Sequence, residues 1–224
     1  MFFGVLDTAL SFMSIYSTKV YTIFMSVVTF IIKNNKLEAT ADRYAYDHSK
    51  KIPYEKLFKI SEMIVIGFAS ECMAKNTIEI YRLRSESAIR GIDDITKCAE
   101  ILWRGVFDED TELLRRPDRI LIGGFDAKPR IFKLSREDSY SKVHKITDDH
   151  AFIGWVDKLE EIYQDKKGSS ADIAIELLQD RCNIRPDLAI GVPRRYIVDK
   201  YGVQETILTE EIKPRNNNTT GKMS

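Results

Sequence analysis

One short stretch of the chain, Met25 to Asp42, constrains the fold more than any other. It reads MSVVTFIIKNNKLEATAD and holds two apolar runs, Val27 to Ile32 and Leu37 to Ala41. The first run is β-branched and aromatic, and the second alternates apolar and polar residues, as strands do. Asn34-Asn35 between them tolerates positive φ, which predicts a tight β-hairpin. Ser26 and Asp42 then lie near the same end of two antiparallel strands.

A serine at the start of a core strand has one special chemical use. Its hydroxyl is a poor nucleophile at neutral pH unless an adjacent base takes its proton. If Ser26 were the first residue of a mature chain, its own α-amino group, with a reference pKa of about 7.7 to 8.0, could be that base. The alternative is purely structural, because amphipathic hairpins that begin with a serine are common.

Four segments, taken together, carry a resemblance to a known family. Ala41-Asp42-Arg43 follows Ser26 at a spacing of sixteen residues. The other three segments are KLFKISEMIVIGFASE (56–71), RILIGGFDAKPRIFKLS (119–135) and RPDLAIGVPRRYIVDKYGV (185–203). In their order and spacing, residues 26 to about 202 resemble the proteasome β-subunit and HslV family of N-terminal-nucleophile hydrolases.

The resemblance implies a fold and a division of the chain. The fold would be α+β, a four-layer αββα sandwich of two antiparallel sheets between helical layers. Residues 1–25 would be an N-terminal extension or propeptide, residues 26–210 the hydrolase domain, and residues 211–224 a disordered polar tail.

The resemblance also implies a peptidase that cleaves peptide bonds through its N-terminal residue. Ser26 would be the nucleophile, Asp42 and Lys56 would tune the charge around it, and Asp187 would orient the terminus. Lys59 is the fallback for Lys56, which arrives two residues earlier than the family spacing. The implied oxyanion donor is the backbone N–H of Ser70.

Several residues depart from the family pattern. Met25 and Ser70 stand where the family has glycine, and Trp155 and Ile190 stand where it usually has serine. These departures favour an alternative function: a catalytically inactive relative that regulates or inhibits another protease, or serves as a structural component.

Composition narrows the classes of function. The chain has 224 residues, 44% of them hydrophobic, which fits one domain. Its 34 basic and 34 acidic residues balance, so its charge gives no reason to expect nucleic-acid binding. Three cysteines without C-x-x-C spacing predict buried free thiols in a reducing compartment. The three histidines show no metal-ligand spacing, so we expect neither a metal nor another cofactor.

The apolar N-terminal segment has three interpretations. A signal peptide would need a basic n-region and a small-residue cleavage site, and neither is evident. A membrane anchor over residues 1 to 32 would have to accommodate Asp7 and Lys19, and residues 27 to 32 fit a core strand better. We prefer the third, a propeptide or an extension upstream of a true start at Met25, since removal of that methionine would expose Ser26.

Partners and location follow from the resemblance. We expect a polypeptide substrate or another protease as partner, assembly as a homo-oligomer, and a cytoplasmic protein without nucleic acid or membrane. The abundance of Asn, Lys and Ile suits a low-GC source such as a phage, which would place the protein in the host cytoplasm or the virion.

The remaining elements are predicted from periodicity and breakers. Residues 44–55 are expected to be a polar loop, and residues 67–70 a turn from strand to helix. Strands are predicted at 56–68, 119–125, 130–134, 188–198 and 204–208, with a short one around 143, and helices at 71–84, 93–107, 155–165 and 171–182.

Overall fold

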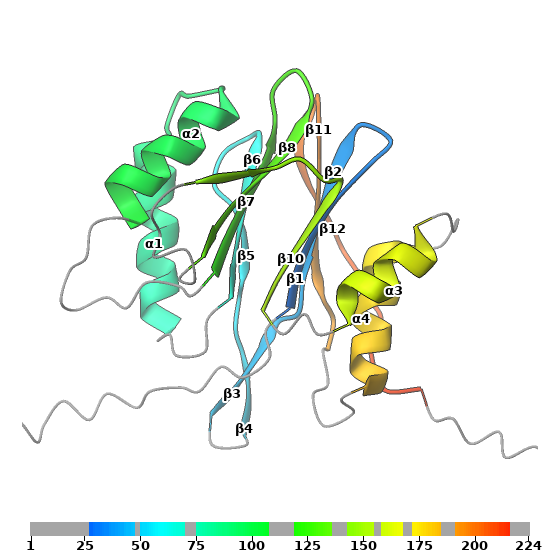
Figure 1. Ribbon diagram of the computed structural model, residues 1–224. Coiled ribbons are helices and arrows are strands. Elements are labelled where there is room, and N and C mark those ends of the chain that lie inside the picture. Colours follow the sequence, from blue (N-terminus) through cyan, green and yellow to red (C-terminus); the bar gives the residue numbers. More distant parts are fainter. Residues whose placement is uncertain are drawn as a thin grey trace, which may run out of the picture.

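A computed structural model describes residues 27–47, 50–69, 75–107, 119–135, 143–154, 158–167, 172–184 and 191–215. These residues form an α+β fold with two five-stranded antiparallel sheets, a separate two-stranded sheet and four α-helices (Figure 1). The predicted fold class is therefore confirmed at the level of α+β with two antiparallel sheets.

The first sheet is built around the predicted hairpin. Its strands have the order β10-β1-β2-β11-β12. Their bounds are β1 (Val27–Lys33), β2 (Lys36–Ala41), β10 (His150–Gly154), β11 (Arg194–Asp199) and β12 (Gly202–Thr206). Lys33 pairs with Lys36 across the turn, and Asn34 and Asn35 have φ of 52° and 58°. The asparagine pair thus makes the tight turn that the sequence predicted.

The second sheet has the order β5-β6-β7-β8-β9. Its strands are β5 (Leu57–Lys59), β6 (Ile64–Ala69), β7 (Arg119–Phe125), β8 (Pro129–Ser135) and β9 (His144–Ile146). The strands predicted at 119–125 and 130–134 correspond to β7 and β8, which pair as a hairpin. The prediction of a single strand over residues 56–68 is wrong, because the chain reverses direction after β5. In this turn the Ile60 N–H donates to the Ile64 carbonyl (3.0 Å), and the Ser61 hydroxyl accepts from the Met63 N–H (3.2 Å).

Gly67 has a different role from the predicted one. The turn expected at residues 67–70 is not formed by Gly67, Phe68 and Ala69, which are all part of β6. A Cβ on Gly67 would lie 2.5 Å from Cγ1 of Val28 on the facing sheet. The glycine therefore permits close approach of the two sheets, a use that looks the same in the sequence as a turn.

The polar loop predicted over residues 44–55 is also wrong in part. Most of it forms the two-stranded sheet of β3 (Tyr44–Asp47) and β4 (Lys50–Pro53). Strand pairing satisfies the backbone N–H and C=O groups of this segment, and Tyr-Ala-Tyr suits a strand despite its polar flanks.

Four α-helices and one π-helical turn complete the described elements. They are α1 (Lys75–Ala88), α2 (Ile95–Leu102), η1 (Trp103–Phe107), α3 (Leu159–Lys166) and α4 (Ile173–Ile184). The helix predicted from residue 93 begins later, because the Asp94 carboxylate accepts from the N–H groups of Thr96 (2.8 Å) and Lys97 (3.0 Å) as an N-cap. The residues just before the predicted third helix form strand β10, in which Ala151 and Ile153 point inward.

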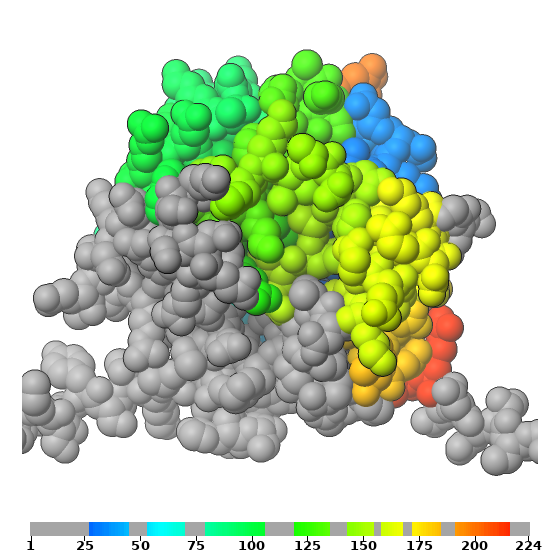
Figure 2. Space-filling view, in the orientation of Figure 1, coloured from blue at the N-terminus to red at the C-terminus, as the bar shows by residue number. Residues whose placement is uncertain are grey.

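Apolar side chains gather in three clusters. One lies between α1, α2 and the second sheet, one between the two sheets, and one between α3, α4 and the first sheet. Figure 1 shows the two helix pairs on opposite sides of the molecule. In Figure 2 the β8–β10 region (yellow-green) forms the surface between α2 and α3.

Three smaller expectations can be compared with the described residues. Ile212 is buried and its N–H donates to the Gly191 carbonyl (2.9 Å), so the packed chain continues beyond residue 210. Cys98 and Cys182 are buried free thiols, as predicted, while Cys72 lies outside the described residues. Within the described part of the chain, no helix is long and apolar enough to cross a bilayer; residues 1–26 lie outside it.

Candidate functional site

An ion pair between Asp42 and Lys56, called the buried pair below, lies at the start of the organising hairpin. The Lys56 Nζ donates to Asp42 Oδ2 at 2.5 Å, and it also donates to the backbone carbonyl of Tyr44 at 2.5 Å. Lys56 is 1% exposed and Asp42 6%. Both charges are therefore almost completely removed from water, which is costly unless each is well bonded.

The other oxygen of Asp42 is bonded to the start of β1. The Val27 backbone N–H donates to Asp42 Oδ1 at 2.7 Å, and the Asp42 N–H donates to the Val27 carbonyl at 3.3 Å. One carboxylate thus joins the ammonium of Lys56 to the peptide group that links residues 26 and 27. Since Ser26 precedes Val27 in the chain, this carboxylate is bonded to the residue that follows Ser26.

Lys56 is held by the backbone as well as by its side chain. It immediately precedes β5, and its carbonyl accepts from the Phe68 N–H at 2.8 Å. Leu57, the next residue, pairs with Gly67 on β6. The backbone of Lys56 is therefore fixed by its own hydrogen bond and by the pairing of Leu57. From this position the long Lys56 side chain reaches Asp42 on the hairpin of the other sheet.

Opposing effects act on the pKa of the Lys56 ammonium. Burial lowers the pKa of Lys56, the Asp42 carboxylate opposes this effect, and the positive charge of Arg181 lowers the pKa further. A lysine whose pKa is lowered holds its proton less tightly than a solvated one does. Hydrogen bonds to Asp42 and Tyr44 still favour the ammonium, so Lys56 can also stabilise negative charge nearby.

Arg181 was not singled out by sequence reasoning. It is 1% exposed on α4, the helix whose buried residues Leu177, Leu178 and Cys182 pack with Val27. A signal was present, since an arginine at that helical spacing falls on the apolar face of its helix. A charged residue on such a face is rare unless its charge is used or paired.

The structure brings together two of the residues predicted for the site. Asp42 and Lys56 are in direct contact, whereas the fallback Lys59 pairs with Glu62 at the surface (2.8 Å). Ser26, Ser70 and Asp187 lie outside the described residues. Their contribution to the site therefore stays a prediction, as do the effects of Trp155 and Ile190, which also lie outside.

A second group of ionisable residues, the histidine cluster, lies at the other end of β10. His150 Nδ1 lies 2.9 Å from Asp149 Oδ1, and His150 Nε2 lies 2.8 Å from Glu160 Oε2. The His150 ring stacks on Tyr163, with ring centroids 4.1 Å apart. The sequence did not reveal this cluster, because Glu160 and Tyr163 reach β10 only through the packing of α3.

Two carboxylates of the histidine cluster have lowered pKa values. Burial raises the pKa of Asp149, but hydrogen bonds from Lys167, His150 and Tyr163 outweigh it and lower the pKa to about 2. For Glu160 burial is again outweighed, here by hydrogen bonds from Gln164 and His150 and by the charge of His150, so its pKa is lowered. Both groups are therefore ionised acceptors at neutral pH.

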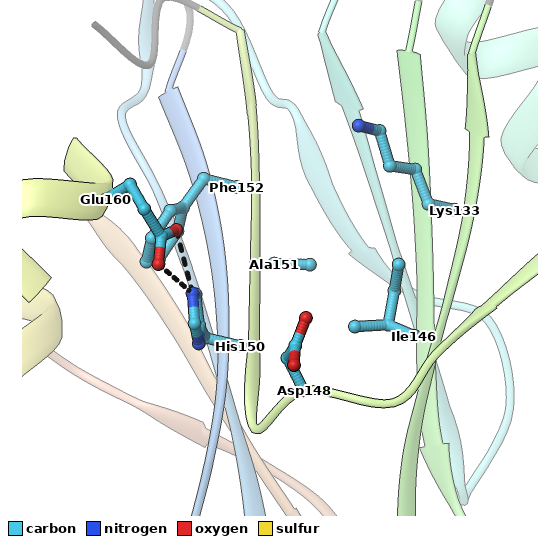
Figure 3. A pocket seen from close by; sticks show the side chains of 7 residues that line it. All are labelled: Lys133, Ile146, Asp148, His150, Ala151, Phe152 and Glu160. Carbon is cyan, nitrogen blue, oxygen red and sulfur yellow. Dashed lines mark hydrogen bonds and ion pairs between the residues drawn. The ribbon is translucent and has the colours of Figure 1, made fainter. Parts of the chain in front are cut away.

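A pocket of about 230 Å³ opens beside the histidine cluster, between β10 and the β8-β9 edge (Figure 3). Its lining consists of Lys133, Ile146, Asp148, His150, Ala151, Phe152 and Glu160. Across the described ranges, no three His, Cys, Asp or Glu side chains are grouped so that they could hold a metal ion.

Comparisons with known proteins add no assignment. No protein-family model matches the chain, and no curated protein matches it at a significant level.

Proposed function

We propose that this protein is an N-terminal-nucleophile peptidase similar to the proteasome β-subunit and HslV, with Ser26 as the nucleophile. The observation that carries the proposal is the buried pair: Lys56 binds one oxygen of Asp42, and the other oxygen accepts from the Val27 N–H, next to Ser26. A nucleophile activated by its own amine needs such fixed charges beside it.

The chemistry would run in two steps. The Ser26 hydroxyl attacks the carbonyl carbon of a peptide bond while the free α-amine takes its proton and passes it to the leaving amine. The resulting acyl ester on Ser26 is then hydrolysed by water, which returns the hydroxyl to its starting state. Lys56 would stabilise the alkoxide as it forms, and Asp42 would hold both Lys56 and the start of β1.

The remaining roles come from the resemblance. The Ser70 N–H would bind the oxyanion of the tetrahedral intermediate, and Asp187 would orient the α-amine. Three apolar clusters, between helices and sheet on either side and between the sheets, support the αββα sandwich of that family. The substrate would be a polypeptide, and the protein would work as a homo-oligomer in the cytoplasm, that of a host cell if a phage encodes it.

The mechanism requires a free amine on Ser26, so residues 1–25 would have to be absent from the active chain. Met25 before Ser26 suits removal of a start methionine, but it departs from the glycine that usually precedes the family's nucleophile. If the natural chain retains these residues, the same fold would serve as the inactive regulatory or structural relative.

The test begins with the intact mass of protein from its natural source and then uses a chain that starts at Ser26. That chain is treated with an electrophile directed at N-terminal serine and threonine, and the adduct is mapped by mass spectrometry. We expect one adduct, on Ser26, which is lost in Ser26→Ala and strongly slowed in Lys56→Met.

The control is Lys59→Met, which removes a surface ammonium and should label at the wild-type rate. An adduct at another residue, or none on a folded chain with a free Ser26, overturns the proposal. An intact mass that includes residues 1–25 instead supports the inactive relative.

A further inference from the structure

Two opposite charges, Lys133 and Asp148, line the pocket beside the histidine cluster, called the β9–β10 pocket below. Lys133 comes from β8, and Asp148 lies between β9 and β10. Among the described residues, neither of these side chains forms an ion pair or a hydrogen bond with another side chain. Figure 3 shows both side chains at the cavity, with the Lys133 ammonium and the Asp148 carboxylate at different positions along it.

The wall formed by β10 is held in place before any ligand arrives. His150 is bonded on both ring nitrogens, by Asp149 and by Glu160, and its ring packs on Phe152 (5.0 Å) and Tyr163 (4.1 Å). Lys167 pairs in turn with Asp149 at 2.8 Å. The charges on this side are therefore largely satisfied by one another, and a fixed wall lowers the entropic cost of binding.

The middle of the pocket is apolar and small. Ile146 and Ala151 point into it from opposite sides in Figure 3, whereas the Phe152 ring packs on His150 on the other side of β10. At about 230 Å³ the cavity exceeds the roughly 150 Å³ that accommodates benzene, yet it is below the roughly 300 to 1,000 Å³ of sites for drug-sized ligands. The size suits a ligand of about one amino acid.

We propose that this pocket binds a small zwitterion, a molecule with one carboxylate, one ammonium and a short apolar body. The carboxylate would pair with Lys133, the ammonium with Asp148, and the apolar body would contact Ile146 and Ala151. Free amino acids are the ordinary members of this class.

A ligand with only one kind of charge fits less well. An anion would meet Lys133 but would also approach the carboxylates of Asp148 and Glu160. A cation would meet Asp148 but would leave Lys133 without a partner and close to a like charge. Only a molecule with both charges pairs with both the half-buried Lys133 and the exposed Asp148, and a charge-assisted hydrogen bond forms on each side.

This pocket is separate from the site of the proposed peptidase. His150 pairs with Ile31, whereas Gly154, at the opposite end of β10, pairs with Val27 beside the buried pair. The proposal therefore does not depend on activity at Ser26, and its test does not measure activity.

The test is a titration of the full chain with leucine, 4-aminobutanoate and 6-aminohexanoate. Binding is measured by isothermal titration calorimetry and by the NMR chemical-shift changes of the β10 amides. Pentylamine and pentanoate, each with one charge, are the matched ligands. We expect saturable binding of at least one zwitterion, and binding of both one-charge ligands about tenfold weaker or more. Lys133→Met and Asp148→Asn should each weaken the binding of the zwitterion by a similar factor.

Lys145→Met and Asp165→Asn are the control variants, since both residues are exposed and neither lines the pocket. They should bind the zwitterion as the wild type does. If a variant at the pocket is misfolded by circular dichroism, Lys133→Gln and Asp148→Ser replace it. Absence of binding, equal binding of a one-charge ligand, or binding that neither pocket variant weakens overturns the proposal.

Discussion

The paired strands β1 and β10 carry an ionic cluster at each end, and the two clusters differ in their access to water. At the Val27 end, both partners of the buried pair are less than a tenth exposed. At the Ile31 end, the side chains of Asp149 and Glu160 in the histidine cluster are 36% and 59% exposed. The same kinds of charge are thus placed in two different dielectric environments.

This difference determines what each cluster can do. A buried ion pair gains little net stability, because the desolvation of two charges offsets most of their attraction, so its presence points to a use for the charges. A half-exposed cluster loses less hydration when it forms, and its interactions are screened by salt. The charges of the buried pair are therefore shielded from water, whereas the carboxylates of the histidine cluster stay in contact with it.

The largest expected effect breaks the buried pair. Asp42→Ala leaves the Lys56 ammonium buried without its carboxylate, so the free energy of unfolding should fall by about 3 to 5 kcal/mol, measured by urea denaturation. Adding Lys56→Met to this variant should recover part of the loss, because the stranded charge is gone. A single variant that unfolds like the wild type would show that Lys56 is not charged and buried as described.

A smaller effect tests the tight contact between the two sheets that places this pair. In Gly123→Ala on β7, the added methyl group would collide with Leu37 and lie 2.6 Å from the Phe30 ring. The free energy of unfolding should fall by about 1 to 3 kcal/mol, measured by chemical denaturation. Gly105→Ala is the control, since nothing described lies within 4 Å of its Cβ position; equal effects would mean that the sheets are loosely packed.

A still smaller effect concerns the histidine cluster at low pH. The pKa of Asp149 is lowered to about 2 from its usual 3.8, so the carboxylate stabilises the fold above about pH 4 and loses this contribution as the pH falls toward 2. Since Asp149 is more than a third exposed, we expect no more than about 1 kcal/mol. Asp149→Asn should have a lower Tm than the wild type at pH 6, and the difference should shrink by pH 2.5. A difference independent of pH would contradict this linkage.

The smallest effect comes from a surface pair near Lys56 in sequence. Lys59 and Glu62 are 2.8 Å apart, with side chains 34% and 85% exposed. Glu62→Gln should change the free energy of unfolding by less than about 1 kcal/mol in the same urea assay. A loss comparable to that of Asp42→Ala would remove the contrast between buried and exposed pairs.

Sequence patterns identified the strands and helices whose signals are local. Periodicity and turn chemistry predicted the Asn34-Asn35 hairpin, the strands β7 and β8, and the helix α2. Predictions failed where one residue type has two uses: Gly67 was interpreted as a turn, but it lies in β6 under Val28. The division of residues 56–68 into two strands was missed because the reversal after β5 depends on backbone bonds around Ser61 that no simple pattern encodes.

For the candidate site, the sequence by itself determined the strand pairing that puts Asp42 beside Val27, because the hairpin register follows from its turn and its alternation. It also pointed to Lys56 through the resemblance. Only the tertiary structure decided that Lys56 rather than Lys59 reaches Asp42, that Arg181 contributes charge from α4, and that Glu160 closes on His150. These contacts join residues far apart in the chain, and their geometry depends on how sheets and helices pack, which short-range patterns do not specify.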